Sequence, residues 1–263
     1  MDNAWVCGSC RSINEARQGR CYRCHAPRDL AAVDPETMPV TGTIPQAGRA
    51  PRYRSSSIRA GVARNLILLA LVVTVAGGLV ARLVADRLLG GSAALGASID
   101  LFTVVAIVQL AAVALALVAW AAWLSRVVGN LPAVGAGYPN VTPRAAFLEN
   151  FVPFLNFLRV PAILRDVVRR LDPGGRGDAL IAAAWLGLVG GILVPRFAGP
   201  VVQIASPDVG SAVDASVVVA QVGIGFQVAG GLFLIALMGW IEGRMRARAR
   251  DIAGRSGEEL AHA

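Results

Sequence analysis

Apolar residues are concentrated in four long runs in the second part of the chain. A helix needs about 20 apolar residues to cross the roughly 30 Å hydrocarbon layer of a bilayer. The runs, each at least that long, lie at residues 65–85, 101–124, 179–199 and 216–240. Because a segment inside a membrane must satisfy its own backbone hydrogen bonds, the pattern predicts four transmembrane helices.

The segment 145–171 is also apolar, but prolines and polar residues interrupt it. Its interruptions are Glu149, Asn150, Pro153, Asn156, Arg159 and Pro161. A charge at the centre of a span costs about 2.5–3.5 kcal/mol, so we expect an interfacial or shallow re-entrant element, not a fifth span. In the second half, charged residues separate apolar ones that recur at helical spacing. The apolar residues are Ile163, Leu164, Val167, Val168 and Leu171. This pattern predicts an amphipathic surface helix.

Composition and charge add an orientation. The chain is 55% hydrophobic and carries a net charge of +8, and its mean hydropathy is +0.58. All 25 basic residues are arginine, which indicates a GC-rich bacterial source. With the N-terminus inside, 22 arginines lie on the cytoplasmic side and 3 on the outer side. Arginine-rich loops stay in the cytoplasm, so the count predicts a plasma-membrane protein with both termini cytoplasmic.

Two further features agree with that orientation. The tryptophans at the ends of the runs would sit at the cytoplasmic interface of the membrane, namely Trp120, Trp123, Trp185 and Trp240. The N-terminus MDNAW lacks the basic start of a secretory signal peptide. The segment before the first span would therefore face a reducing compartment.

All four cysteines lie in that segment, as two Cys-x-x-Cys pairs: Cys7, Cys10, Cys21 and Cys24. Two such pairs can present four thiolates to one zinc ion in a closed, structural site. A module of about 30 residues is too small to bury a stable core without a metal or disulfides. Disulfides or unrelated thiols are the alternatives, but a cytoplasmic location favours zinc. His25 follows the last cysteine and is expected to be a surface residue.

Trp5 lies two residues before the first cysteine, and Asn14 lies four residues after the second. With the cysteine spacing, they make residues 1–30 resemble the Ran-binding-protein-two type of zinc finger. The resemblance implies two crossed β-hairpins around one zinc, and binding of single-stranded RNA, ubiquitin or another protein.

The specialised surfaces of that finger family are altered in this chain. Arg11 and Ser12 stand where ubiquitin-binding members carry Thr-Phe. Glu15 replaces an aromatic residue that stacks on RNA bases, and Gln18 replaces one of two guanine-reading arginines, while Arg17 matches the other. A cytosolic protein is therefore the favoured partner and nucleic acid is disfavoured. A purely structural finger is the other alternative.

The membrane domain carries no recognisable catalytic motif, and no enzymatic activity is expected. Gln109, Gln221 and Gln227 lie within the apolar runs, where they either bond across helices or line a passive pore. Buried acids or histidines are missing from the runs, which argues against a coupled transporter. Gly187-x-x-x-Gly191 and Gly225-x-x-x-Ala229 predict close helix packing, within the chain or in a homo-oligomer, unless they only reflect composition.

A second set of motifs follows the second run. Trp123-x-x-Arg126-x-x-x-Asn130 is followed by Phe151-x-Pro153-x-x-Asn156 and by Pro161. Over about 65–250, the chain resembles an actinobacterial membrane family, the domain of unknown function numbered 4328, which implies several spans and no known activity. Asn130, Asn156 and the arginines 126 and 159 would order the interfacial element against the helix ends, or the arginines would only contact anionic lipid.

The sequence thus predicts a mainly α protein with four domains or segments. They are a β-hairpin zinc ribbon at 1–30, a flexible linker at 31–62, a polytopic four-helix membrane domain at 63–250 with the interfacial or re-entrant element, and a cytoplasmic tail at 251–263. The expected function is recruitment of a cytosolic partner to the membrane by the finger. A small channel or transporter with a regulatory finger is the alternative, and RNA tethering a weaker one.

Overall fold

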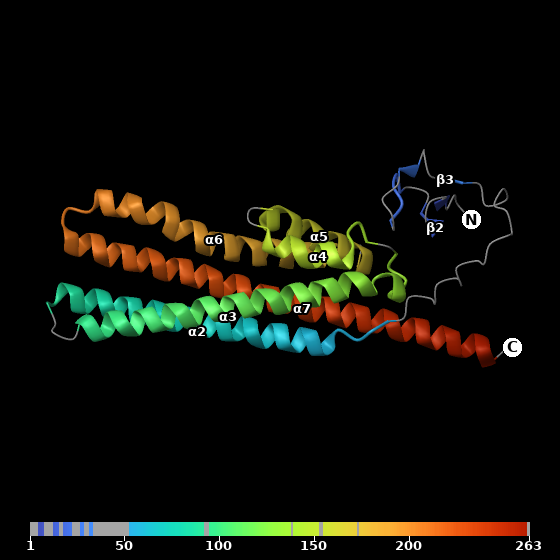
Figure 1. The fold of residues 1–263 in the computed structure, drawn as a ribbon, viewed down its shortest axis with the longest axis horizontal. Helices are drawn as coiled ribbons and strands as arrows, with labels where there is room; N and C mark the ends of the chain where they lie inside the picture. Colours follow the sequence, from blue (N-terminus) through green and yellow to red (C-terminus); the bar gives the residue numbers. More distant parts are fainter. Residues whose placement is uncertain are drawn as a thin grey trace.

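Two long helical hairpins lie side by side in the computed structural model of the protein (Figure 1). The first consists of α2 (Ser57–Leu89) and α3 (Leu95–Asn130), and the second of α6 (Arg176–Ala205) and α7 (Val209–Ala261). The structure describes residues 5–7, 13–15, 18–22, 27–28, 32–33, 53–91, 95–137, 139–152, 155–172 and 174–261.

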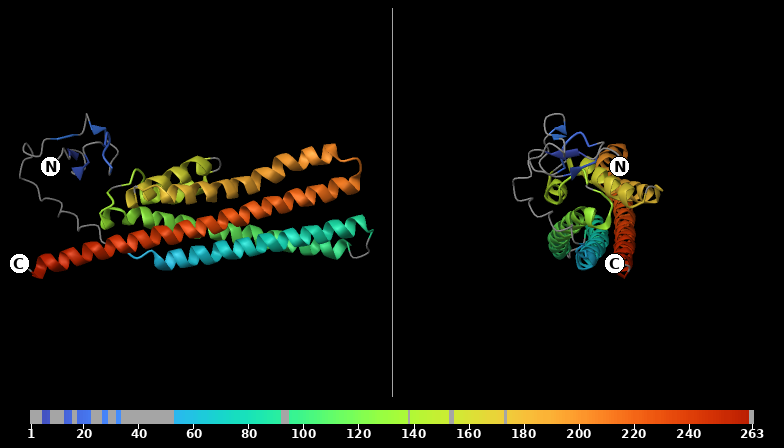
Figure 2. Two further views of the ribbon diagram at one scale, coloured as in Figure 1. Left: turned by 180° about the vertical axis from the view of Figure 1, so that it is seen from behind. Right: turned by 90° about the vertical axis from the view of Figure 1, so that its right-hand side faces the viewer.

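The bundle has two different ends, which Figure 2 shows from behind and along its length. The turns after Leu89 and Ala205 lie together at one end, here called the hairpin end. The shorter helices and the last turns of α7 lie toward the other, here called the terminal end. The elements at the two ends therefore belong to different sides of any membrane that the bundle crosses.

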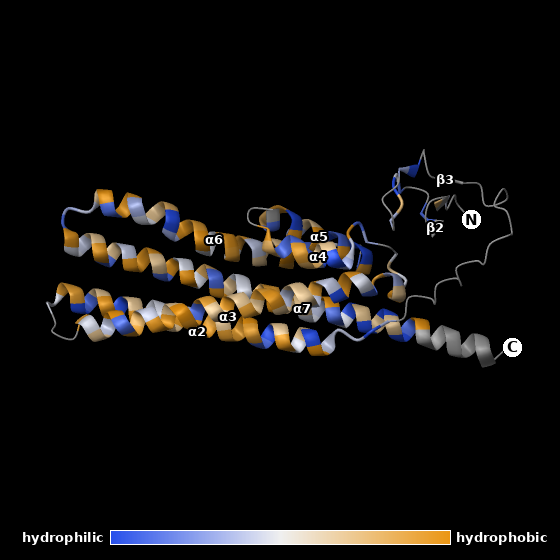
Figure 3. Ribbon diagram, viewed as in Figure 1, coloured by the Kyte–Doolittle hydropathy of each residue, from blue (hydrophilic) through white to orange (hydrophobic). Residues whose placement is uncertain are grey.

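All four long helices are long and apolar enough to cross a membrane. Many of their large apolar side chains point outward, including Leu110 at 73% exposure and Phe197 at 68%. An apolar surface of that extent is typical of contact with lipid, and Figure 3 shows the apolar residues along the whole length of the hairpins. The prediction of four helices that are long and apolar enough to cross a membrane is confirmed. The helices are longer than the apolar runs because a helix continues into polar sequence beyond the hydrocarbon layer.

The tightly packed core lies in the terminal half of the bundle. Trp123, Leu124 and Val127 of α3 are fully buried there, against Leu237 and Met238 of α7. The sequence predicted that Trp120 and Trp123 face the membrane interface, and this is wrong: they are 5% and 0% exposed. Both indoles fill the core because α4, α5 and α7 cover the end of α3 that carries them.

The segment after α3 forms four short or medium elements. They are η2 (Pro132–Val134), α4 (Pro143–Leu148), η3 (Glu149–Phe151) and α5 (Leu155–Leu171). None of them is among the four candidate spans in the described chain. The helix α5 is amphipathic, as predicted. Its apolar face packs into the bundle core, where Leu164, Val167 and Val168 are fully buried. Protein therefore covers the face that we expected at a membrane surface.

The second hairpin is held together by glycine contacts. A Cβ atom added to Gly187 would lie 2.5 Å from the backbone of Gly230, and one added to Gly191 would lie 2.8 Å from the carbonyl oxygen of Gly223. The close packing predicted for Gly187 and Gly191 therefore occurs between α6 and α7. The partner glycines are not those of the predicted Gly225 motif, since a Cβ at Gly225 would meet no atom within 4 Å.

Three short strands form the described part of the N-terminal module. They are β1 (Trp5–Cys7), β2 (Ile13–Asn14) and β3 (Ala32–Val33), in the antiparallel order β2-β1-β3. The β1–β2 pairing agrees with a hairpin. β3 and the first turn of α2 both fall within the stretch 31–62 that the sequence analysis treats as linker.

Candidate functional site

The N-terminal module is organised by the tryptophan and the asparagine that the sequence singles out. The indole Nε1 of Trp5 donates a hydrogen bond to the carbonyl oxygen of Gln18 at 2.9 Å. Asn14 Nδ2 donates to the carbonyl oxygen of Trp5 at 3.4 Å, and Asn14 Oδ1 accepts from the backbone N–H of Tyr22 at 3.0 Å. These bonds join the segment of the first cysteine pair to that of the second.

The two cysteines that the structure describes are buried together. Cys7 and Cys21, one from each Cys-x-x-Cys pair, are 0% exposed and belong to one cluster with Trp5. Thiolates are preferred ligands of zinc, so the burial of both thiols is compatible with the predicted metal site. Cys10 and Cys24 lie outside the described residues, as does His25, so the predicted set of four is placed only in part.

The module lies against the terminal end of the bundle. A Cβ atom added to Gly137, in the loop before α4, would lie 2.9 Å from Glu15 Oε1 and 3.2 Å from an Arg170 guanidinium nitrogen. Residues of the module and of this loop also share the lining of a cavity of about 890 Å³, together with α5 and α7. The replacement of an aromatic by Glu15 thus places a carboxylate beside a basic helix.

Next to the module, the terminal half of the bundle contains a buried polar layer, defined by Trp120, Trp123, Asn130, Asn150 and Glu242. Trp123 Nε1 donates to Glu242 Oε1 at 2.9 Å, and Trp120 Nε1 donates to Asn150 Oδ1 at 3.0 Å. The two indole rings lie 5.0 Å apart between centroids. The layer therefore ties α3 to α7 and to η3 by hydrogen bonds inside an apolar core.

Glu242 is the residue of this layer that sequence reasoning missed. It is 4% exposed, and among the described residues nothing makes a hydrogen bond to its Oε2 atom. It lies two residues beyond the fourth apolar run, 216–240, and none of the sequence motifs includes it. Only the continuation of α7 beside α3 buries it, and no local pattern in the sequence signals that contact.

Two hydroxyl groups lie near Glu242. The Tyr53 Oη and Ser56 Oγ atoms are both buried, and Tyr53 lies in the electrostatic field of Glu242. Burial raises the pKa of the Tyr53 phenol, and the Glu242 carboxylate raises it further, while Ser56 and Arg246 oppose the shift. The segment before α2 is thereby in electrostatic contact with α7.

Asn130 fastens the same segment to α3. Its Nδ2 donates to the carbonyl oxygen of Arg54 at 2.7 Å, and its Oδ1 accepts from the backbone N–H of Arg54 at 3.3 Å. We expected Asn130 to order the interfacial element; instead it binds the chain that leads from the module. Arg126, one turn earlier on α3, lies in the electrostatic field of Arg54 and Arg59.

The other motif residues order the segment after α3 from within. Arg159 forms two hydrogen bonds with Glu149, at 3.1 and 3.2 Å, and these join α5 to η3. The Glu149 carboxylate raises the pKa of Arg159. Asn156 Nδ2 donates to the Asn150 carbonyl oxygen at 3.5 Å, a marginal distance. Pro153 lies outside the described residues, and Pro161 is within α5.

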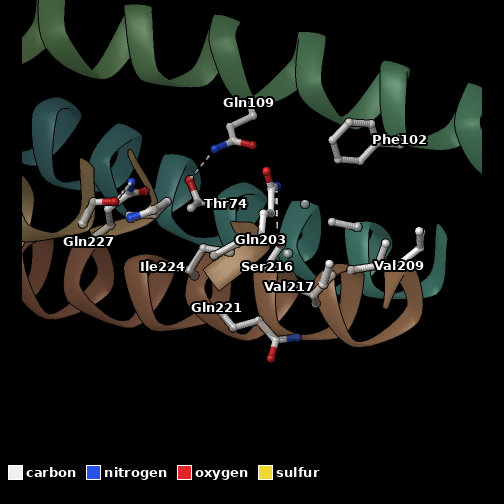
Figure 4. A pocket seen from close by; sticks show the side chains of 18 residues that line it. Thr74, Phe102, Gln109, Gln203, Val209, Ser216, Val217, Gln221, Ile224 and Gln227 are labelled. Atoms are coloured by element: carbon white, nitrogen blue, oxygen red, sulfur yellow. Dashed lines mark hydrogen bonds between the residues drawn. The ribbon is translucent and has the colours of Figure 1, made fainter. Parts of the chain in front are cut away.

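The three glutamines predicted within the spans lie at the other end of the core, toward the hairpin end. Gln109, Gln221 and Gln227 all line a cavity of about 710 Å³ between the two hairpins. Figure 4 shows the amide of Gln221 turned away from that of Gln109. Gln203 also lines the cavity; it was missed because α6 continues six residues beyond the predicted end of the third span.

Comparison with known proteins gives a family and no close relative. No curated protein and no solved structure matches the chain. A family model, the domain of unknown function DUF4328, matches residues 85–234, which include α3, α6 and the polar layer up to Asn150. The match covers more than half of the 263 residues, and the chain therefore belongs to the DUF4328 family.

Proposed function

We propose that this protein is a non-enzymatic membrane anchor whose N-terminal module, held by zinc, recruits a cytosolic protein to the membrane. The observation that carries the proposal is the pair of buried cysteines, Cys7 and Cys21. They lie in a module whose segments are joined by hydrogen bonds of Asn14 and Trp5. A structural zinc supplies no chemistry of its own here. It would hold the two chain segments at a fixed distance and leave the module surface to bind a partner.

The proposal includes an orientation with both termini in the cytoplasm. It rests on the arginines at the terminal end, where α5 and the last part of α7 carry most of those outside the module. A labelling experiment on cysteine-free protein tests it: single cysteines placed at Ser57 and at Ser206 are probed with an impermeant maleimide in intact cells. Labelling of position 206 alone is the expected result, and the opposite pattern would reverse the orientation.

The alternative function, a small channel or transporter, requires a continuous path through the bundle. The polar cavity near the hairpin end favours it. The packing of Trp123, Leu124 and Met238 at 0% exposure opposes it, because these side chains occupy the terminal half of the described bundle. We therefore propose an anchor in preference to an open pore.

The experiment compares full-length wild type with Cys21→Ser and with His25→Ala. Zinc is quantified in purified samples, and proteins crosslinked in native membranes are co-purified. We expect about one zinc per chain in wild type and His25→Ala, loss of zinc in Cys21→Ser, and loss of the same cytosolic protein with it.

Two results would count against the proposal. If Cys21→Ser contained as much zinc as wild type, the four cysteines would not form the proposed metal centre. Recovery of the same partners with all three proteins, despite zinc loss, would show that the module is not the docking site. RNA tethering has its own outcome in the same samples: RNA crosslinked to wild type and lost in Arg17→Ala would replace the protein partner.

A further inference from the structure

The cavity between the two hairpins has a defined position. It lies between α2 and α3 on one side and α6 and α7 on the other, in the half near the hairpin end (Figure 4). From Val209 to Gln227 its lining extends over nineteen residues of α7, or about 27 Å at the rise of a helix. The core around Trp123 follows on the terminal side, and an Arg82–Asp214 ion pair of 2.9 Å joins the hairpins on the other side.

Two glutamine amides in the cavity each donate one N–H to the protein. Gln109 Nε2 donates to Thr74 Oγ1 at 3.2 Å, and Gln227 Nε2 donates to the Gly191 carbonyl oxygen at 3.2 Å. Thr74 gives its own proton to the Ala70 carbonyl oxygen at 2.8 Å, so it can only accept from Gln109. Because both partners are acceptors, each glutamine must point its NH₂ group toward the protein. The amide oxygen and the second N–H of each glutamine can then bond to a ligand.

A third amide is at the wider part of the cavity. Gln203 Nε2 lies 3.3 Å from Ser216 Oγ, and Figure 4 shows its side chain between those of Gln109 and Gln221. The remaining lining is mainly apolar, with Phe102, Val213, Val217 and Ile224 among its members. No charged side chain is found among the lining residues in the described helices.

These features define a ligand. A charged group would lose its hydration without gaining a counter-charge, so the ligand is uncharged. Unused amide carbonyls and N–H groups are matched by a hydroxyl, which both donates and accepts. The apolar lining matches hydrocarbon, and the volume is that of a site for a small organic molecule. Outward-facing apolar residues such as Leu110 and Phe197 place the same depth of the bundle in lipid.

We propose that this cavity binds an uncharged, hydroxyl-bearing lipid of the diacylglycerol type. Its hydroxyl group bonds to the amides of Gln109 and Gln203, and its acyl chains lie along the apolar lining of α3 and α7. This is a ligand site in the membrane domain, separate from the zinc module, and it does not depend on partner recruitment.

The test uses full-length protein in phosphatidylcholine nanodiscs with a diacylglycerol that carries a diazirine in one acyl chain. Photolabelled peptides are identified by mass spectrometry, with unlabelled diacylglycerol or its O-acetylated form as competitor. We expect labels on α3, α6 or α7 along the cavity, competition by diacylglycerol, and none by the acetylated form at the same concentration.

Matched variants separate the hydroxyl contact from simple filling by hydrocarbon. Gln109→Leu with Gln203→Leu removes both hydrogen bonds and is expected to lower labelling about tenfold. Gln221 also lines the cavity, but its amide is turned away from that of Gln109 and makes no contact with the hydroxyl in the proposed complex. Gln221→Leu therefore makes the same chemical change without removing a proposed hydrogen bond, and labelling is expected to stay within about twofold. If the double variant is not monodisperse, Gln203→Leu alone, at an exposed position, carries the comparison.

The proposal is overturned by any of three results. One is equal competition by the acetylated lipid, which would mean that any acyl chain fills the cavity. Another is labelling of the double variant at the wild-type level. The third is labelling spread over the lipid-facing surface of the four helices without enrichment along the cavity.

Discussion

The hydrogen bond between Trp123 and Glu242 is expected to stabilise the membrane domain because each residue satisfies the buried polar group of the other. A double-mutant cycle can measure the coupling energy between the two residues. The bond is 2.9 Å long, and the two residues are 0% and 4% exposed. Glu242→Leu leaves the indole N–H buried without an acceptor, and Trp123→Phe leaves the carboxylate without its donor. Each loss costs about 1–3 kcal/mol, with about 1 kcal/mol more for the smaller ring of phenylalanine.

The double variant Trp123→Phe/Glu242→Leu is expected to lose less than the sum of the two single changes. Replacing both partners removes the unpaired polar groups, so the cycle should give a coupling energy of about 1–3 kcal/mol. Glu242→Gln keeps the volume and an acceptor oxygen, and it is expected to stay within about 1 kcal/mol of wild type. For a domain of this size, 1 kcal/mol corresponds to about 2–4 °C in Tm.

The assay is thermal unfolding of the four proteins and of Glu242→Gln in one detergent, followed by circular dichroism at about 222 nm, where helices absorb. Loss of ellipticity is compared at equal protein and detergent concentration, and the order of the Tm values is the readout. Two single changes that add within about 0.5 kcal/mol would refute the reasoning. So would a Glu242→Leu protein as stable as Glu242→Gln.

Three other expectations test separate features. The pKa of Tyr53 is raised above 10.0 in the folded protein. Its contribution to stability is therefore complete below pH 10 and is lost as the pH rises through the higher folded pKa. In Tyr53→Phe, Tm should fall less between about pH 9 and 11 than in wild type. Gly187→Ala forces a Cβ into the α7 backbone and should cost about 1–3 kcal/mol, whereas Gly225→Ala, with nothing within 4 Å, should leave Tm unchanged or higher; equal effects would contradict the glycine contacts. Asn130→Ala removes both bonds to the Arg54 backbone, and hydrogen exchange at residues 53–58 should become faster there and not in the α6–α7 hairpin.

Much of the architecture follows from the sequence because apolar run length is a strong signal in membranes. The four runs correspond to four helices that are long and apolar enough to cross a membrane, and none of the helices described within 145–171 is among them. The spacing of apolar residues in α5 was also sufficient to identify its buried face. Run length does not encode where a helix stops, so α6 continues past the predicted end of the third span and includes Gln203.

The errors at the site share one cause, which is tertiary contact between distant segments. Trp120 and Trp123 looked like interfacial anchors because they end an apolar run, and α7 and η3 bury them instead. Gly225 looked like a packing residue because of its spacing, but the rotation of α7 turns Gly223 and Gly230 toward α6. Such contacts are set by which helix faces which, and a single sequence gives no pairing information.

The length of α7 has a mechanical consequence for the two polar regions. The helix runs from Val209 to Ala261 without a proline, while α6 contains Pro195 and Pro200. Gln227 in the cavity wall and Glu242 in the polar layer are fifteen residues apart on this one rod, about 22 Å. Because no proline interrupts α7 between them, a tilt of the helix at one residue also moves the other. An occupant that pushes the hairpins apart would therefore strain the bond between Glu242 and Trp123, at the end of the bundle that faces the N-terminal module.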